Sequence, residues 1–187
     1  GGTAVSCNDD QSKGATAKTG VDSGGGGYTL NIAKANISGG DGRCAEPGCG
    51  LYSVGGYGLY NDSGGTTTIA GKKVNIIGGI YPVDNHLRNR AIFNQGTLVV
   101  LEAGAIGDEK TPYSLTNIGG EVDIYGGRDW NKNGKWENVA GTFRVHGKKL
   151  DFDSDTKTLT GQLCNGYKLH VVFTKGTPVL IDEDDDP

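Results

Sequence analysis

Residues 91–100 read AIFNQGTLVV, and the same arrangement of residue types occurs twice more in the chain. Residues 58–69 read GLYNDSGGTTTI, and residues 114–124 read SLTNIGGEVDI. Each stretch has an apolar residue, one spacer, an Asn, a turn that contains Gly, and then a run of alternating apolar residues. Alternation with a period of two is typical of a β-strand, in which every second side chain points to the same face. The three stretches therefore predict a repeated unit built from strands.

The alternating runs also align with one another along the chain. In each run two apolar or nearly apolar positions are separated by one residue, so both lie on one face of a strand. The aligned pairs are Leu30 and Ile32, Thr67 and Ile69, Leu98 and Val100, Val122 and Ile124, Phe143 and Val145, and Leu169 and Val171. Another column precedes three of these runs, at Leu59, Ile92 and Leu115, each two residues before Asn61, Asn94 or Asn117.

A third strand is predicted after the first run, because residues 31–40, 68–79 and 145–152 carry similar patterns. The repeat length is 23 residues, counted from Asn94 to Asn117. A repeat of this size with three short strands predicts a coil of a parallel β-helix, whose strands pair with their equivalents above and below. Gly suits the tight corners, and stacked Asn side chains can bond neighbouring backbone there. We therefore interpret the repeated Asn residues as structural.

The repeats resemble the right-handed parallel β-helix (pectate-lyase-like) superfamily and the repeats of bacterial surface adhesins. LYNDSGGTTTI, AIFNQGTLVV and SLTNIGGEVDI carry this resemblance, with weaker copies over about 28–172. It implies an all-β fold, a β-solenoid of about six short coils. A Greek-key sandwich would explain the alternation but not the aligned columns. The resemblance says little about function, because the superfamily includes lyases, hydrolases, adhesins and phage tail proteins.

The expected organisation is one solenoid domain with different ends. Residues 1–27 form a polar, Gly-rich segment that can act as a cap or as a strand exchanged between subunits. Residues 28–180 form the solenoid, and residues 181–187 form an acidic tail. FDSDTKTL, within residues 151–160, predicts a terminal β-hairpin with SDTK as its turn. Its Asp151, Asp153 and Asp155 are also compatible with a cation-binding loop.

Composition narrows the function classes. Gly accounts for 34 of the 187 residues, against about 13 at the average usage of ~7%. Met is absent, as expected for a mature chain whose leader has been removed, or for one cut to mimic it. The net charge is −4, and no basic stripe with aromatic residues suggests a nucleic-acid partner. No apolar run approaches the ~18 residues that predict a membrane-spanning helix.

The cysteines indicate disulfides, although free thiols and a metal site remain alternatives. Cys44 and Cys49 bracket AEPG, a tight loop that a disulfide could close. This leaves Cys7 and Cys164 as a second pair, joining the first segment to a late one. A zinc site would need another pair of Cys or His residues at a suitable distance, and none follows. Disulfides would indicate an oxidising, extracellular setting.

The segment DWNKNGKWEN, residues 129–138, is a candidate Ca²⁺ site. An Asp-x-Asn-x-Asn-Gly loop aims several oxygens at one point, and Ca²⁺ binds six to eight oxygen ligands. The candidate ligands are Asp129, Asn131, Asn133, the carbonyl of Lys135, and Glu137. The loop departs from an EF-hand at its twelfth position, Ala140, where a bidentate Glu would belong. A plain Asn-Gly hairpin loop is the alternative.

The segment YPVDNHLRNR, residues 81–90, lies in the longest insertion between repeats. Asp84, His86, Arg88 and Arg90 are candidate ligand contacts, because β-helix enzymes place Arg, Lys and carboxylates on outer loops. The aligned outward positions Asn31, Thr68, Val99, Asp123 and Arg144 form no acidic cluster. The other candidate contacts are Trp130 and Trp136, which either pack over the loop at 129–138 or stack on sugar rings.

Taken together, these features favour a secreted or cell-surface protein without enzymatic activity. We expect a structural or adhesive β-solenoid that associates with itself, forms filaments, and is stabilised by Ca²⁺. Self-association is expected because the ends of a short stack expose strand edges. The alternatives are a carbohydrate-active β-helix enzyme, a polysaccharide lyase or hydrolase, and a sugar-binding module. Glycans are therefore a second class of expected partner, and insertion into a membrane is not expected.

Overall fold

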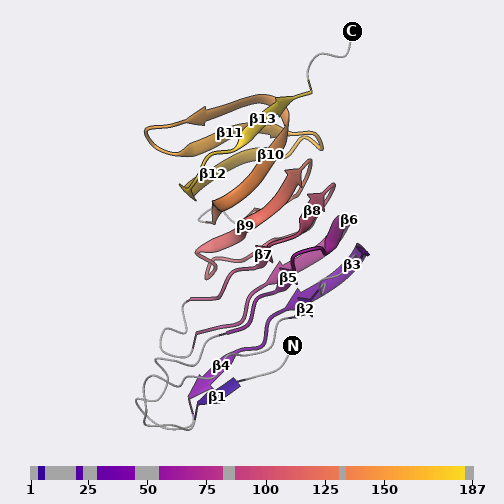
Figure 1. Cartoon of the computed structure of the whole chain (residues 1–187), viewed down its shortest axis with the longest axis vertical. Helices are drawn as coiled ribbons and strands as arrows, with labels where there is room; N and C mark the ends of the chain where they lie inside the picture. Colours follow the sequence, from indigo (N-terminus) through magenta and orange to yellow (C-terminus); the bar gives the residue numbers. More distant parts are fainter. Residues whose placement is uncertain are drawn as a thin grey trace.

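The computed structural model describes residues 4–6, 20–22, 29–44, 55–81, 87–130 and 134–183 of the chain. The regular secondary structure in these ranges consists of β-strands only (Figure 1). The strands are β1 (Ala4–Ser6), β2 (Val21–Asp22), β3 (Thr29–Ser38), β4 (Gly42–Cys44), β5 (Leu59–Asn61), β6 (Thr66–Ile77), β7 (Ile92–Asn94), β8 (Thr97–Val100), β9 (Tyr113–Ile124), β10 (Lys135–Asp153), β11 (Thr158–Leu163), β12 (Lys168–Lys175) and β13 (Val179–Asp182). The predicted all-β class is confirmed.

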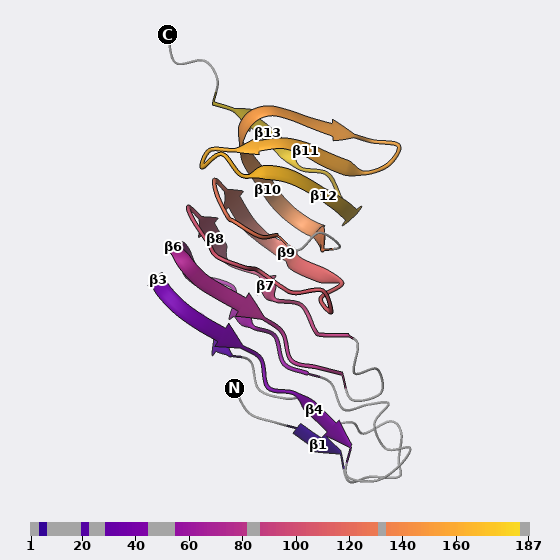
Figure 2. The same ribbon diagram turned by 180° about the vertical axis from the view of Figure 1, so that it is seen from behind.

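Most of the strands join one sheet that is largely parallel. A first column of parallel pairs contains β2, β5, β7, the start of β9, the start of β10, and β12. A second column contains β3, β6, β8, the end of β9, the middle of β10, and β13. The strands follow one another along the long axis of the molecule, from β3 and β6 to β10–β13 (Figures 1 and 2). This arrangement is compatible with a β-helix.

The observed register confirms the alignment that the sequence predicts for five of the six runs. Leu30 pairs with Thr67, Thr67 with Leu98, Leu98 with Val122, and Val122 with Phe143. The outward positions pair in the predicted order as well, from Asn31 through Thr68, Val99 and Asp123 to Arg144. In a parallel pair, a shift of one residue would turn the apolar side chains to solvent, so the buried face selects this register.

The column at Leu59, Ile92 and Leu115 is also confirmed, because these residues pair in order and are fully buried. It continues through Trp136 to Phe173. Aromatic side chains thus fill the C-terminal end of the core, where the N-terminal coils use aliphatic ones. The ring centroids of Trp136 and Phe143 lie 5.3 Å apart, and those of Phe143 and Phe173 lie 5.1 Å apart.

The sixth run differs from the prediction. Leu169 and Val171 lie in β12, where they pair antiparallel with β11. This strand continues the first column instead of the second, through Val172 and Phe173. The sixth place in the second column belongs to β13, in which Leu180 pairs with Val145. The same apolar alternation occurs in every column. It therefore does not predict which column a strand joins after the chain has formed a hairpin.

Residues 145–152 also differ from the prediction, which aligned them with residues 31–40 and 68–79. Their end, from Gly147 onward, pairs antiparallel with β11. Lys149 has a φ of 52°, the left-handed conformation, within a break in the register between Lys148 and Asp151. This bulge turns β10 away from the parallel columns. The predicted terminal hairpin is confirmed, since Asp153 pairs with Thr158 across a turn at residues 154–157.

Candidate functional site

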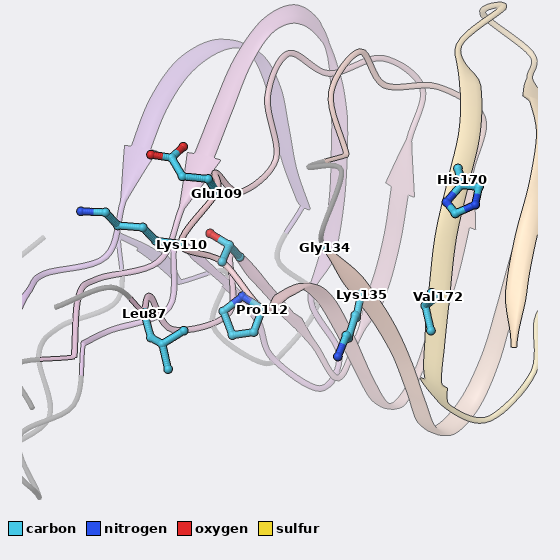
Figure 3. A pocket seen from close by; sticks show the side chains of 9 residues that line it. Leu87, Glu109, Lys110, Pro112, Gly134, Lys135, His170 and Val172 are labelled. Carbon is cyan, nitrogen blue, oxygen red and sulfur yellow. The ribbon is translucent and has the colours of Figure 1, made fainter. Parts of the chain in front are cut away.

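A hollow of about 460 Å³ lies beside the starts of β9 and β10 (Figure 3). Leu87 and Lys135 line it. They come from residues 80–90 and 128–139, two of the three places where the repeat is interrupted, the third being residues 41–50. Lys110 and Pro112 contribute from the loop before β9, and His170 from β12. The hollow is therefore assembled from segments that are far apart in the sequence.

The hollow is bordered by ionisable side chains of both signs. Glu109, Lys110, Lys135 and His170 line it. Within the described ranges, no hydrogen bond or ion pair joins any two of these four side chains. The lining therefore combines two lysines and one carboxylate with apolar surface from Leu87, Pro112 and Val172.

The loop before β9 is held by Asp108. Its Oδ1 accepts from the backbone N–H of Lys110 at 2.9 Å, and Thr111 Oγ1 accepts from the N–H of Asp108 at 3.0 Å. Arg88, a predicted ligand contact, pairs through Nε with Asp108 Oδ2 at 2.7 Å and donates to the carbonyl of Gly78 at 2.9 Å. Arg88 therefore positions the loop on the preceding coil, and its guanidinium is occupied by the protein.

Arg90, another predicted ligand contact, lies in a buried polar cluster with Thr116 and Glu137. Arg90 Nε lies 2.8 Å from Thr116 Oγ1 and 3.1 Å from Glu137 Oε1. Thr116 Oγ1 donates to the same carboxylate oxygen at 2.5 Å. The Glu137 side chain is only 3% exposed, and a carboxylate so deeply buried needs a cation and hydrogen-bond donors. The guanidinium also lies over the Tyr113 ring, 4.9 Å from its centroid.

The predicted Ca²⁺ ligands are only partly described. Asn131 and Asn133 lie outside the described residues. Asp129 is exposed and its backbone bridges to Ala105, whereas Glu137 joins the buried cluster with Arg90. In the ranges that the structure describes, no three His, Cys, Asp or Glu residues are grouped as a metal site would need. Calcium binding at this loop therefore stays a prediction.

Trp130 and Trp136 do not form a sugar-stacking surface, which corrects one of the two predicted roles. They are 2% and 0% exposed, and their rings meet edge to face at 4.9 Å between centroids. An indole stacks on a sugar ring only where one of its faces is open to solvent. Both indoles instead belong to the buried hydrophobic core. The remaining predicted contacts, Asp84 and His86, lie outside the described residues.

The predicted bond between Cys7 and Cys164 is not found. Cys164 is a free, exposed cysteine in the turn between β11 and β12, and Cys7 lies outside the described residues. Burial raises the pKa of the Cys164 thiol, and the nearby charge of Glu183 raises it further. A raised pKa keeps the group as a thiol at neutral pH, so it is a weak nucleophile. Cys49 and the side chain of Cys44 also lie outside the described residues.

The repeated Asn residues form a continuous ladder, as their predicted structural role requires. Asn61 Nδ2 donates to Asn94 Oδ1 at 2.7 Å, and Asn94 Nδ2 donates to Asn117 Oδ1 at 2.8 Å. The ladder extends one coil beyond the prediction, because Asn117 Nδ2 donates to Asn138 Oδ1 at 2.9 Å. We call Asn61, Asn94, Asn117 and Asn138 the Asn ladder. Asn138 follows Asn117 by 21 residues, about one repeat, so the spacing could have revealed it.

Thr67 explains why a polar residue can occupy an apolar column. It is fully buried, and its Oγ1 donates to Asn61 Oδ1 at 2.8 Å. Asn61 is the first of the four residues that we call the Asn ladder, and the Thr67 hydroxyl supplies a donor to its carbonyl oxygen. A hydroxyl at position 67 satisfies that oxygen, which a Leu or Val could not do.

A second polar cluster, which the sequence did not predict, surrounds His146. Its Nε2 lies 2.8 Å from Asp123 Oδ1, and its Nδ1 lies 3.1 Å from Glu183 Oε1. The imidazole stacks on Tyr125 with 3.9 Å between ring centroids. Desolvation raises the pKa of Tyr125, and the charges of Asp123 and Glu183 add to this. The cluster fastens the end of β13 to the rest of the sheet, since Glu183 comes directly after that strand.

No helix in the described ranges is long and apolar enough to cross a membrane. Comparison of the whole chain with protein-family models, with curated proteins and with solved structures finds no match.

Proposed function

We propose that this chain is a parallel β-helix of about six coils that serves as a structural or adhesive module outside the cell and associates with itself. The repeated register supports the coil architecture. Each coil contributes one strand to each parallel column, and the Asn ladder crosses four successive coils. The right-handed direction of the coils and the extracellular location are inferred from the resemblance of the repeats to the superfamily and to surface adhesins. The free thiol of Cys164 gives no support to an extracellular location.

The observation that carries the self-association is that the second column has an open strand at each end. At the first end, β3 pairs with β6, and at the other end β13 pairs with β10. In the described part of the chain, neither strand pairs along its other edge. Open strand edges are templates for pairing with another chain. The first column differs at its C-terminal end. Its last strand, β12, has no open edge there, because it pairs with β10 on one side and with β11 on the other.

The edge of β3 also ends a second, shorter line of amides. Asn75 Nδ2 donates to Asn36 Oδ1 at 2.8 Å, and the backbone N–H of Ala105 donates to Asn75 Oδ1 at 2.8 Å. Asn36 is exposed on β3. Its Nδ2 group can therefore donate to a further coil, which a second copy of the chain would supply.

We expect the protein to form oligomers whose mass rises with concentration, and Asn36→Asp to reduce that association about tenfold. Asp keeps the oxygen that accepts from Asn75 but cannot donate, and it places a negative charge on the edge. Sedimentation velocity over a hundredfold concentration range, with negative-stain electron microscopy, measures both results.

Ser154→Asp is the matched control, because it adds the same charge at an exposed position in the β10–β11 turn. This variant should associate as the wild type does. A wild-type chain that stays monomeric at every concentration would remove self-association from the proposed function.

Calcium is proposed as a stabilising ion at the loop that begins with Asp129. Removing it with a chelator should lower the melting temperature by a few degrees, because about 1 kcal/mol corresponds to ~2–4 °C in a chain of this size. Asp129→Ala should abolish this difference, whereas Asp155→Ala, in the hairpin turn, should preserve it. Differential scanning calorimetry with and without chelator measures the shift, and identical curves would exclude the ion.

A carbohydrate-binding or carbohydrate-active role is the second candidate, favoured by the hollow near Lys110 and Lys135. Its volume of about 460 Å³ lies within the range of ligand sites, roughly 300–1,000 Å³. Incubation with acidic polysaccharides distinguishes the two forms of this candidate. Retention on the polysaccharide without new products indicates a binding module, and unsaturated or shortened products indicate a lyase or a hydrolase.

A further inference from the structure

Three exposed lysines gather at one corner of the first two coils. Lys34 follows the second column in β3, and Lys72 and Lys73 follow it in β6. They line a hollow of about 440 Å³ together with the amide side chains of Asn36 and Asn75. We call Lys34, Lys72 and Lys73 the corner lysines.

The corner lysines carry positive charge that the described part of the chain leaves unneutralised. Lys34 pairs directly with Lys73 in the parallel register, and neighbouring strands are only about 4.8 Å apart. Like charges directly opposite each other on a sheet are destabilising. Within the described ranges none of the three forms an ion pair with a carboxylate. This costly arrangement, in a chain whose net charge is −4, suggests an anionic partner.

The other end of the same chain carries a matching run of negative charge. Residues 182–186 read DEDDD, and we call them the acidic segment. Asp182 and Glu183 are exposed. Glu183 Oε1 lies 3.1 Å from Nδ1 of His146 in the same chain, so the test below changes only the three residues that follow Glu183.

The register places Lys34 and Asp182, the first residue of the acidic segment, at equivalent places in the second column. The second column runs from Ile32 through Ile69, Val100, Ile124 and Val145 to Leu180. Two residues after Ile32 comes Lys34, and two residues after Leu180 comes Asp182. A second copy stacked on the same axis would therefore bring its acidic segment to the corner lysines.

We propose that the corner lysines receive the acidic segment of a second copy, so that β13 of one copy pairs alongside β3 of the next. This head-to-tail contact rests on the self-association proposed above and names the surfaces that make it. Such a contact is heterologous, because two different surfaces meet, and it propagates into a filament unless the rotation closes a ring. The charges set the order of the ends, since two lysine ends or two acidic ends repel.

Charge reversal at each surface tests the contact. The first variant replaces Lys34, Lys72 and Lys73 with Glu, and the second replaces Asp184, Asp185 and Asp186 with Lys. Each alone should weaken association at least tenfold in sedimentation velocity. Mixing the two should restore association as alternating assemblies. The Glu corner of the first variant then meets the Lys tail of the second, and the unchanged lysine corner of the second meets the unchanged acidic tail of the first. Replacing three exposed lysines elsewhere, Lys157, Lys168 and Lys175, with Glu is the matched control and should leave association unchanged.

The lysine-to-Glu variant should fold normally, because it replaces one set of repelling charges with another of equal size. Circular dichroism and the melting temperature check this. Raising the salt to about 1 M shortens the Debye length to about 3 Å and should weaken wild-type association. If the wild type associates and the lysine-to-Glu variant associates equally well, the head-to-tail charge contact is wrong while self-association stands.

A labelled peptide of residues 179–187 tests the surface without relying on self-association. It should bind the wild-type chain in fluorescence anisotropy, bind the lysine-to-Glu variant at least tenfold more weakly, and lose binding when its acidic residues are replaced by Asn and Gln. Equal binding to the wild type and the variant, or no binding to either, would overturn the proposed contact. A monomeric wild type that still binds the peptide would overturn the proposed function and retain the anion-binding corner.

Discussion

Replacing Asn94 with Ala is expected to lower the free energy of unfolding by about 3 kcal/mol. Asn94 is fully buried in the middle of the Asn ladder. Its Oδ1 accepts from Asn61, and its Nδ2 donates to Asn117 at 2.8 Å and to the carbonyl of Gly96 at 3.0 Å. Alanine would leave a donor on one neighbour and an acceptor on the other without these bonds. Each buried polar group that loses its partner costs ~1–3 kcal/mol.

Asn138→Ala provides the matched control at the end of the ladder. Asn138 accepts one bond from Asn117 and donates to the carbonyl of Gly141 at an exposed position. Water can replace partners there, so we expect a loss of about 1 kcal/mol. Urea denaturation of both variants measures the difference. Equal losses would show that the ladder contributes through the size of its side chains and not through the continuity of its hydrogen bonds.

Replacing Arg90 with Ala is expected to cost about 3–4 kcal/mol of unfolding free energy. The variant would leave the Glu137 carboxylate, which is 3% exposed, with Thr116 as its remaining partner in the cluster. Removing one member of a buried ion pair typically costs ~3–5 kcal/mol, because the other charge stays buried without compensation. Chemical denaturation with tryptophan fluorescence measures the loss, since Trp136 adjoins Glu137 in β10.

Two further variants distinguish this buried charge from an ordinary ion pair. Arg90→Ala combined with Glu137→Gln should be more stable than Arg90→Ala alone, because an amide carries no charge into the core. Arg144→Ala should cost less than about 1 kcal/mol. Arg144 and Arg90 have similar side-chain exposure, 32% and 30%, but Arg144 pairs with the more exposed Asp123 and Glu121. Similar losses for Arg90→Ala and Arg144→Ala would contradict the role of Glu137 burial.

Local patterns account for the parts of the architecture that were predicted correctly. AIFNQGTLVV determines which side chains face inward, because alternation along a strand and the position of Asn94 are properties of consecutive residues. Its equivalents in neighbouring coils carry the same information, so their register could be read before any coordinates. Gly96 follows the same logic. A Cβ at this position would lie 2.3 Å from the carbonyl oxygen of Gly65 on the preceding coil, a contact that leaves room only for Gly.

The candidate site was predicted less completely, because its residues meet only through the stacking of distant segments. Leu87 and Lys135 line one hollow although they come from different insertions. Arg90 and Glu137 are separated by 47 positions, and the residues around each of them in the sequence do not predict that the two meet. For Trp130 and Trp136 the sequence left packing and sugar stacking as alternatives, because polar residues surround both of them. Their burial depends on the direction in which β10 starts.

The amino-acid sequence by itself determined the strands, the apolar columns and the Asn residues that stack from coil to coil. These depend on a period of two within a strand and on a repeat length, both of which short-range steric and hydrophobic effects impose. Only the tertiary structure decided that β13, and not β12, completes the second column, and that Glu137 is buried with Arg90. It also decided that Lys34 in β3 and Asp182 in β13 follow the same column of the stack. The physical reason is that strand pairing joins residues by their place in the coil, so distant charges become neighbours only when the coils are stacked.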